Sequence, residues 1–295
     1  MPFERDKYFF HYTTREAAFA HILPEQSLKF SRYLDMRDPL ENKYWRFLAG
    51  GWGHATEAES QQQVAGYLAF DDTAKHIRER SFLLSLTVDS PPEFGEAEPF
   101  CSGWARARMW EQYAENHFGI CLVFDREQLV ESVVSSLRAQ GFAAPYHRKV
   151  IYDGSGMMKP PLEFADLVGE VTPQQVSAYI ERNHEVLFFH KALDWATEHE
   201  YRFSTTSSDQ EGLFVDYGQS LEAVIVGESF PAWERPAAIA ACHCAAATPE
   251  RLDWTMGAPV LADLKPLENR RDEIRENIEA VRMAGPPRAE PPTQT

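Results

Sequence analysis

Residues 191–203 read KALDWATEHEYRF, and the alternation that begins at Glu198 predicts a strand after a helical run ending near Trp195. Successive strand side chains point to opposite faces, which groups the residues as follows: Glu198, Glu200 and Arg202 on one face, and His199, Tyr201 and Phe203 on the other. Two carboxylates beside a guanidinium are unsuited to an apolar core, so we expect the charged face to meet solvent or a ligand. An ordinary edge strand with an alternating Glu/Arg surface is the alternative.

The composition is that of a globular protein. The chain has 295 residues, of which 44% are hydrophobic and 13% aromatic, enough to bury a large core in one domain or two. No stretch approaches the roughly 20 apolar residues that span a bilayer. The charged N-terminus lacks the apolar segment of a signal peptide, and four cysteines do not suggest a disulfide scaffold. We therefore expect a cytoplasmic protein without membrane partners.

The net charge of −16 argues against a protein that coats nucleic acid, because such binding depends on neutralising phosphates. A local basic groove remains compatible with this charge. Arg78 with Arg80, or Arg106 with Arg108, could contribute to one. The acidic surface is therefore a weak constraint on function.

The remaining pattern predicts one α+β domain over residues 1–265, a charged helix at 266–285 and a disordered, proline-rich tail at 286–295. The expected strands are 7–12, 28–31, 81–88, 120–124, 149–152, 198–203, 212–216 and 221–226. The expected helices are 13–23, 57–70, 106–117, 125–140 and 172–195. Thr13 with Glu16 and Thr172 with Gln175 fit capping boxes, and Asp125 is a further expected N-cap.

Several familiar signatures are missing. There is no dinucleotide-binding or Walker-type glycine loop, and the glycine-rich turn at residues 50–53 lacks the strand and helix that either requires. Cys242 and Cys244 flank His243, but without a second cysteine pair they make a poor zinc site. Cys121 lies in a strand that we expect to be buried, which disfavours a nucleophilic role. No metal site is expected.

Five blocks of sequence together resemble a bacterial family. They are Phe-His11-Tyr12-Thr13, Leu28-Lys-Phe-Ser31, Asp38-Pro39-Leu-Glu41, Met109-Trp110-x-x-Tyr113-Ala114-x-x-His117-x-Gly119 and Lys191-x-x-x-Trp195-x-x-Glu198-x-Glu200-x-Arg202. The family is catalogued as domain of unknown function twenty-nine seventy-one, and the resemblance covers roughly residues 8–226. Arg37 stands where that family usually has asparagine. Membership implies no particular activity.

The order of these blocks is also similar to that of ADP-ribosyltransferases, in which a histidine lies on the first strand and a Glu-x-Glu pair on a late strand. This resemblance implies a split, mostly antiparallel sheet with flanking helices, and NAD as co-substrate. It implies that Glu200 is the catalytic carboxylate and that Glu198 addresses the acceptor. Breaking the nicotinamide–ribose bond develops an oxocarbenium-like sugar, which a nearby carboxylate stabilises.

The same resemblance implies roles for the residues expected to bind NAD, namely His11, Tyr12, Thr13, Ser31, Tyr33 and Arg202. His11 would hold the adenosine-side ribose, and Tyr33 would stack on nicotinamide. Ser31 would support the glutamate, while Arg202 would hold a carboxylate or a phosphate. The residues alone favour a partly buried His11 bonded to backbone, and they place the stripe of Met109, Trp110 and Tyr113 in the core.

Three functions remain open at this point. The first is an ADP-ribosyltransferase that modifies a protein or nucleic-acid acceptor, as a toxin or phage-defence effector with a possible inhibitor protein. This function predicts that His11, Tyr33 and Glu200 converge on one cleft. A metal-dependent nuclease would instead cluster Glu198 and Glu200 with Asp38 or Glu41 around Mg²⁺. A binding or regulatory module predicts an exposed apolar patch and no cleft.

Overall fold

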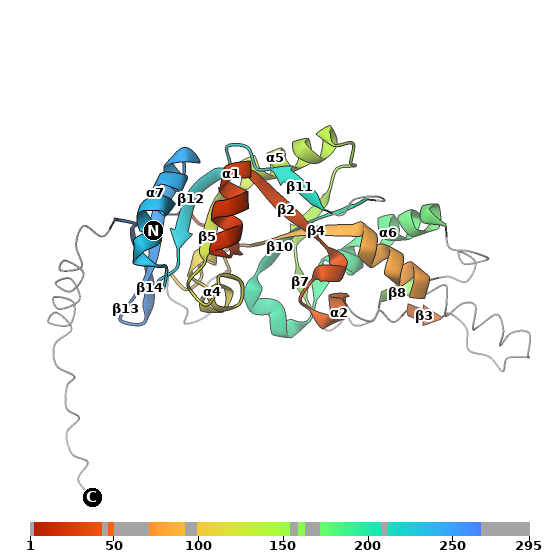
Figure 1. The fold of residues 1–295 in the computed structure, drawn as a ribbon. Helices are drawn as coiled ribbons and strands as arrows, with labels where there is room; N and C mark the ends of the chain where they lie inside the picture. The colour runs from red at the N-terminus through yellow and green to blue at the C-terminus, as the bar shows by residue number, and fades with distance from the viewer. Residues whose placement is uncertain are drawn as a thin grey trace, which may run out of the picture.

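The computed structural model describes residues 3–42, 47–49, 71–91, 99–153, 159–162, 172–207 and 212–266. Its strands are β1 (Tyr8–Thr13), β2 (Ser27–Arg32), β3 (Phe47–Ala49), β4 (Ser81–Thr87), β5 (Ile120–Asp125), β6 (Tyr146–Lys149), β7 (Ile151–Tyr152), β8 (Lys159–Leu162), β9 (His190–Lys191), β10 (Glu200–Thr206), β11 (Leu213–Asp216), β12 (Leu221–Val226), β13 (Thr248–Thr255) and β14 (Ala258–Asp263). Figure 1 shows β4 and β10 crossing the middle of the molecule, with α1 (Leu23–Glu25) and α5 (Arg126–Ala139) on one side of them and α4 (Ala107–Tyr113) on the other.

In the part of the chain that the structure describes, the helices are a π-helix, short 3₁₀ turns and α-helices of 3 to 16 residues. They are η1 (Ala17–Ile22), α1 (Leu23–Glu25), η2 (Tyr33–Asp35), α2 (Pro39–Asn42), η3 (Gly103–Ala105), α4 (Ala107–Tyr113), α5 (Arg126–Ala139), α6 (Pro173–Phe188), η6 (Leu193–Glu198), η7 (Ala232–Glu234) and α7 (Arg235–Cys244). Residues 71–80 are helical as well. In the described ranges no helix is long and apolar enough to cross a membrane.

One ten-stranded sheet forms the centre of the fold. Its main path runs β11-β2-β4-β1-β5-β12-β13-β14, and β10 lies between β4 and β6. The pairs in this sheet are antiparallel except for β12 with β13. The predicted α+β class with a mostly antiparallel sheet is therefore confirmed.

The sheet opens along one edge of β4. On one side, β10 pairs with β4 over its whole length, from Glu200 opposite Thr87 to Thr206 opposite Ser81. On the other side, β2 pairs with β4 only at residues 82–83, and β1 joins it only at Thr87. β1 and β2 thus separate along the middle of β4. A cleft lies at this opening, lined by residues of β1, β2 and β4.

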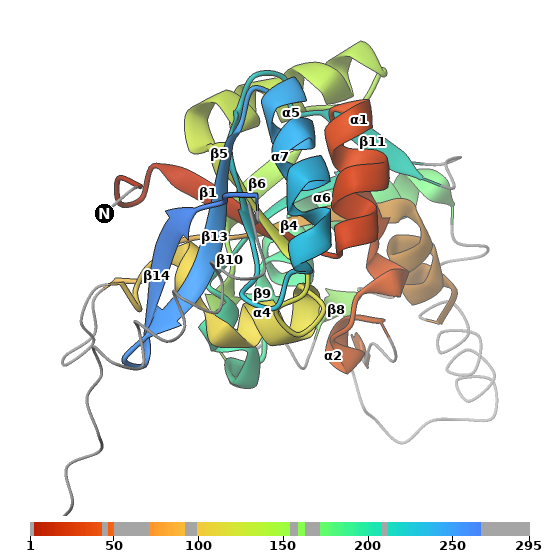
Figure 2. The ribbon, with the colours of Figure 1, turned by 60° about the vertical axis from the view of Figure 1, so that its left-hand side comes forward.

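The two faces of the sheet are covered differently. Figures 1 and 2 place α1, α5 and α7 on one side of the sheet and α4 on the other. The first side carries the largest apolar core, which includes Phe9, Leu84 and Phe203. The second side carries two smaller cores, one beneath α4 around Trp110 and one beneath α6 around Phe188. Polar residues can therefore gather between these smaller cores.

Two of the predicted helix caps are confirmed. The Asp125 carboxylate accepts a hydrogen bond from the Gln128 amide at the start of α5. Thr172 and Gln175 form the expected capping box at the start of α6. The capping box predicted at Thr13 is wrong, because Thr13 belongs to β1. The neighbouring threonine acts instead, since the Thr14 hydroxyl accepts from the Ala17 amide.

The helix predicted over residues 106–117 ends early, at Tyr113. Glu115, Asn116 and His117 adopt the left-handed conformation, with φ of 49°, 53° and 66°, which ends the right-handed helix. The turn leads to Gly119, where an added Cβ would lie 2.5 Å from the Thr13 carbonyl oxygen. A close approach of two backbones therefore ends α4.

Other predictions differ from the structure or lie outside it. The pair β13–β14 and helix α7 were not predicted. The helix expected at 57–70, the glycine turn at 50–53, the helix at 266–285 (apart from its first residue) and the tail at 286–295 lie outside the described residues. The single-domain assignment of residues 1–265 stays a prediction.

Candidate functional site

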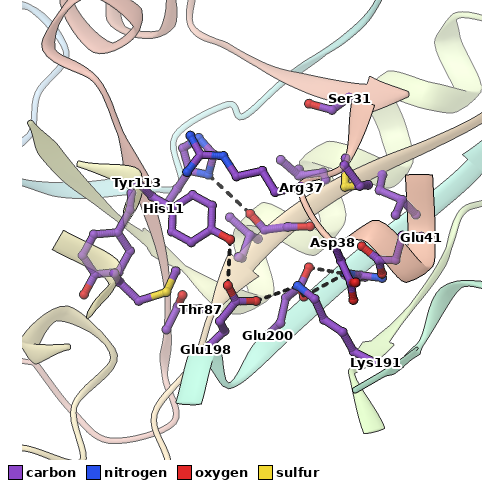
Figure 3. A pocket seen from close by; sticks show the side chains of 18 of the residues that line it. His11, Ser31, Arg37, Asp38, Glu41, Thr87, Tyr113, Lys191, Glu198 and Glu200 are labelled. Atoms are coloured by element: carbon purple, nitrogen blue, oxygen red, sulfur yellow. Dashed lines mark hydrogen bonds and ion pairs between the residues drawn. The ribbon is translucent and has the colours of Figure 1, made fainter. Parts of the chain in front are cut away.

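A cleft of about 230 Å³ lies where the sheet opens (Figure 3). Its walls come from β1, β2, β4 and α4, from the segment between η2 and α2, and from the stretch that begins at Lys191. Many of its polar residues belong to the blocks singled out in the sequence: His11, Ser31, Asp38, Glu41, Tyr113, Lys191, Glu198, Glu200 and Arg202. Segments far apart in the chain therefore meet at one site.

The predicted strand begins two residues later than expected. Glu198 is the last residue of η6, His199 is left-handed with φ 44°, and β10 starts at Glu200. The strand is not an edge strand, because it pairs with both β4 and β6. His199 therefore does not share a strand face with Tyr201, although Tyr201 and Phe203 do lie in the apolar core as predicted.

The charged face of β10 is buried, contrary to a solvent-exposed Glu/Arg surface. Glu198 and Glu200 are each 5% exposed and Arg202 is 1% exposed, yet all three line the cleft. Such burial requires that each charge be compensated by hydrogen bonds and opposite charges. The contacts of Arg202 and Lys191 provide this compensation.

Arg202 contacts two carboxylates. Its Nε and Nη2 donate to the two oxygens of Glu200 at 2.5 and 3.0 Å, which is the forked geometry favoured by guanidinium and carboxylate groups. Its Nη1 donates to Glu41 at 2.5 Å and to the Phe188 carbonyl at 2.8 Å. Arg202 thereby joins β10 to α2 and to the end of α6.

Lys191 joins the two glutamates. Its Nζ lies 2.7 Å from Glu198 Oε2 and 3.2 Å from Glu200 Oε2, and 4.6 Å from the centroid of the Trp195 ring. The Tyr113 hydroxyl donates to the other oxygen of Glu198 at 2.7 Å. The contacts of Glu198 with Lys191 and with Tyr113 are drawn in Figure 3, where the carboxylates point toward Lys191. Lysine and tyrosine together fix the orientation of Glu198.

The surrounding charges decide the protonation of Glu200. Burial alone would raise the pKa of this carboxyl, but Arg202 and Lys191 outweigh burial and lower it to about 2. Burial likewise lowers the pKa of the Lys191 ammonium, but the charges of Glu200, Glu41 and Glu198 together outweigh it, so the net pKa is raised. Glu200 and Lys191 are therefore both charged at neutral pH.

The two glutamates differ in how many acceptor positions are occupied. A carboxylate offers about four lone-pair positions. Glu200 uses them for three contacts with Arg202 and Lys191 and for a bond with the Ser85 side chain. Glu198 accepts one hydrogen bond on each oxygen from the described residues. Glu198 is thus the carboxylate with capacity to bind a ligand hydroxyl.

The residues of the first two strands are placed as follows. His11 lines the cleft, partly buried, with Nδ1 3.4 Å from the Ser85 carbonyl oxygen on the open edge of β4. Burial lowers the pKa of its imidazole, so the ring is neutral at pH 7. Ser31 also lines the cleft. Tyr12 reaches it only in part, because its hydroxyl donates to the Gly103 carbonyl, and Thr13 does not line it.

Tyr33 does not have the predicted role. Its side chain is fully buried, its hydroxyl donates to the Leu187 carbonyl at 2.8 Å, and its ring packs edge-on against Phe188. It therefore belongs to the core beneath α6 and does not form a wall of the cleft. The aromatic residue with a polar contact inside the cleft is Tyr113, which the helical spacing had grouped with the core.

The charged or polar lining residues without a predicted catalytic or cofactor role include Lys29, Arg37, Tyr113 and Lys191. Lys29 shares the face of β2 with Ser31, and this i, i+2 spacing was a usable signal. The other three become functional candidates only through contacts between distant segments, which spacing does not reveal.

No set of three His, Cys, Asp or Glu side chains within the described ranges is arranged to hold a metal ion. Cys242 and Cys244 lie on α7, where Cys242 is buried and Cys244 exposed. Burial raises the pKa of the Cys242 thiol to about 12, which disfavours the thiolate that binds metals. Cys121 is buried in β5 as predicted.

Comparison with known proteins gives one result. Neither the curated proteins nor the solved structures contain a significant match to the chain. Residues 109–203, which run from α4 into β10 and include Tyr113, Lys191, Glu198 and Glu200, match a family model. That model is described as "Protein of unknown function (DUF2971)", so residues 109–203 are similar to the family that the sequence blocks resemble.

Proposed function

We propose that the protein is an NAD-dependent ADP-ribosyltransferase whose site is the cleft at the opening of the sheet. The observation that carries the proposal is the placement of Glu198 and Glu200 in this cleft, which His11 also lines from β1. A buried carboxylate next to a sugar ring is what cleavage of a glycosidic bond requires. The resemblance of the sequence blocks to ADP-ribosyltransferases adds NAD as the source of that sugar.

The reaction breaks the bond between nicotinamide nitrogen and ribose C1′. The nitrogen leaves with the bonding electron pair, so nicotinamide departs as a neutral molecule and positive charge develops on the sugar. A nucleophilic acceptor then forms a bond to C1′ and loses its proton, which leaves an ADP-ribosylated product. The protein's part is to hold an anion beside the developing charge.

We assign this part to Glu198 and not to Glu200. Glu200 is anionic, but its acceptor positions are taken by Arg202, Lys191 and Ser85. Glu198 retains acceptor capacity and is oriented by Tyr113 and Lys191. This reverses the roles that the Glu-x-Glu resemblance implied. In this assignment Glu200 anchors Lys191, which in turn positions Glu198.

The opposite wall supplies groups suited to the rest of the dinucleotide. His11 is a neutral imidazole that can exchange hydrogen bonds with ribose hydroxyls, and Ser31 offers a hydroxyl. Lys29 adds a cation on the same face of β2. Tyr33, fully buried, has no part in binding NAD.

The two alternatives have less support. A nuclease would hold Mg²⁺ with clustered carboxylates, and among the described residues no group of three or more His, Cys, Asp or Glu side chains is arranged to hold a metal ion. The carboxylates that such a nuclease would use, Glu41, Glu198 and Glu200, form ion pairs with Lys191 or Arg202 instead. A binding module would present a joined apolar patch. The most exposed large apolar residues, Leu193, Trp233 and Met256, lie on three separate segments.

Calorimetric titration with NAD tests the proposal, followed by measurement of nicotinamide release. We expect binding by the wild type and release that falls by about 10²–10³-fold in Glu198→Gln. Glu222→Gln is the matched control, because Glu222 is an exposed carboxylate on β12 outside the cleft. It should release nicotinamide at the wild-type rate. Failure of the wild type to bind NAD at millimolar concentration would overturn the proposal.

A further inference from the structure

Arg37 is an exposed residue of the cleft wall that reaches from the segment between η2 and α2 toward Tyr113 on α4 (Figure 3). Its guanidinium carbon lies 4.7 Å from the centroid of the Tyr113 ring. Its Nη1 donates to the Gln112 carbonyl at 2.6 Å. A planar cation that belongs to the chain itself therefore lies on an aromatic ring that lines the cleft.

The ring beneath Arg37 is held in one orientation. Tyr113 is the last residue of α4, and its hydroxyl donates to Glu198 at 2.7 Å. Burial, followed by the charge of Glu198, raises the pKa of this phenol, so it remains a donor at neutral pH. A flat group placed on the ring thus lies close to a carboxylate whose position is fixed.

Arg37 differs from the other arginines of this region in its partners. Arg202 is paired with Glu200 and Glu41, and Arg32 is paired with Asp35. Among the described residues, Arg37 contacts no carboxylate, only a ring and a carbonyl. Another planar cation could make the same contacts, because a guanidinium is held on an aromatic face through its charge and its flat shape.

We propose that Tyr113 and Glu198 form a binding site for a planar cation, and that Arg37 occupies this site until a ligand displaces it. The ligand class is a guanidinium or an N-substituted pyridinium. The face of an aromatic ring attracts cations, and the adjacent carboxylate adds to this preference, so a neutral ring of the same shape binds less well. The inference concerns the cleft of the proposed function but does not require transfer of ADP-ribose.

Ligand-observed NMR titrations of the full chain test this site. The probes are methylguanidinium and 1-methylnicotinamide, with neutral nicotinamide as the matched ligand. Removing the resident cation in Arg37→Ala should tighten binding of a cationic probe by about tenfold, because the site is then no longer occupied. Arg32→Ala is the control, since it removes a neighbouring guanidinium that pairs with Asp35. It should bind as the wild type does.

A second variant separates occupancy of the site from a general change in charge. Arg37→Ala combined with Tyr113→Leu should lose the tenfold gain, because the aromatic face is gone. Equal affinity of wild type and Arg37→Ala for both cations, or equal affinity of Arg37→Ala for nicotinamide and 1-methylnicotinamide, would overturn the inference. Binding of one cation alone identifies the ligand as a guanidinium or a pyridinium. Cation binding without NAD binding would refute the proposed function and leave this site standing.

Discussion

The two faces of β10 are both buried, but by different means. Tyr201 and Phe203 pack into the apolar core, where Phe203 meets Phe9 edge-on. Glu200 and Arg202, which alternate with them, are as inaccessible to solvent and are held by opposite charges. One strand thus combines an apolar face that packs and a polar face that lines a cleft.

This difference bears on what each face is for. Apolar burial stabilises a fold in proportion to the area removed from water. A buried ion pair gains little net stability, because desolvation of the charges offsets their attraction. We infer that the charged face is explained by the cleft that it lines, whereas the aromatic face is explained by stability.

Replacing one residue of each face should cost similar free energy for different reasons. Arg202→Met leaves Glu200 and Glu41 buried without their guanidinium, and we expect a loss of about 3–5 kcal/mol. Phe203→Ala leaves a cavity and should also lose about 3–5 kcal/mol. Denaturant unfolding at pH 7 measures both. Adding Glu200→Gln to Arg202→Met should recover part of the first loss; no recovery would contradict the charge explanation.

The pH dependence of the unfolding free energy should differ between variants of the two faces. In the wild type the pKa of Glu200 is lowered to about 2, so its contribution is full above its ordinary pKa near 4.5 and is lost as pH falls through 2. In Arg202→Met, burial without the guanidinium raises that pKa. The difference in unfolding free energy between this variant and the wild type should therefore shrink on acidification. The difference for Phe203→Ala should stay constant from pH 7 to 4. Parallel behaviour of the two variants would refute this distinction.

The smallest expected effect is at the edge of the charged cluster. Tyr113→Phe removes one hydrogen bond to Glu198, while Lys191 still holds that carboxylate. We expect a loss of about 1–2 kcal/mol in unfolding free energy, with the ring that Arg37 covers retained. The rate of nicotinamide release should fall by a larger factor than this loss of unfolding free energy alone would explain. An unchanged rate would show that Tyr113 does not position Glu198.

The sequence predicted those parts of the fold that depend on local pattern. Continuous apolar runs located β4, β5 and β12, and threonine and aspartate caps located α5 and α6. The same reasoning failed at His199, where a single left-handed residue removes Glu198 from the strand. It also failed at Tyr33, because a tyrosine after a strand shows no local sign of whether its hydroxyl meets a ligand or the Leu187 carbonyl.

The site itself was predicted in part. Glu198, Glu200, Arg202, His11 and Ser31 line the cleft, as the resemblance implied. Lys191, which binds both glutamates, was inside the quoted stretch but was given no role. Its importance depends on where its ammonium lies after the 3₁₀ turn η6, and no spacing rule describes that geometry.

The contact between Arg202 and Glu41 has a consequence for the order in which the molecule is made. The two residues are separated by 161 positions in the chain, and Tyr113 and Glu198 by 85. On a ribosome, the N-terminal half would leave the exit tunnel with Glu41 and Tyr113 still awaiting their partners. The cleft is therefore assembled only after β10 has been synthesised, so a nascent chain cannot begin to act before most of the protein exists.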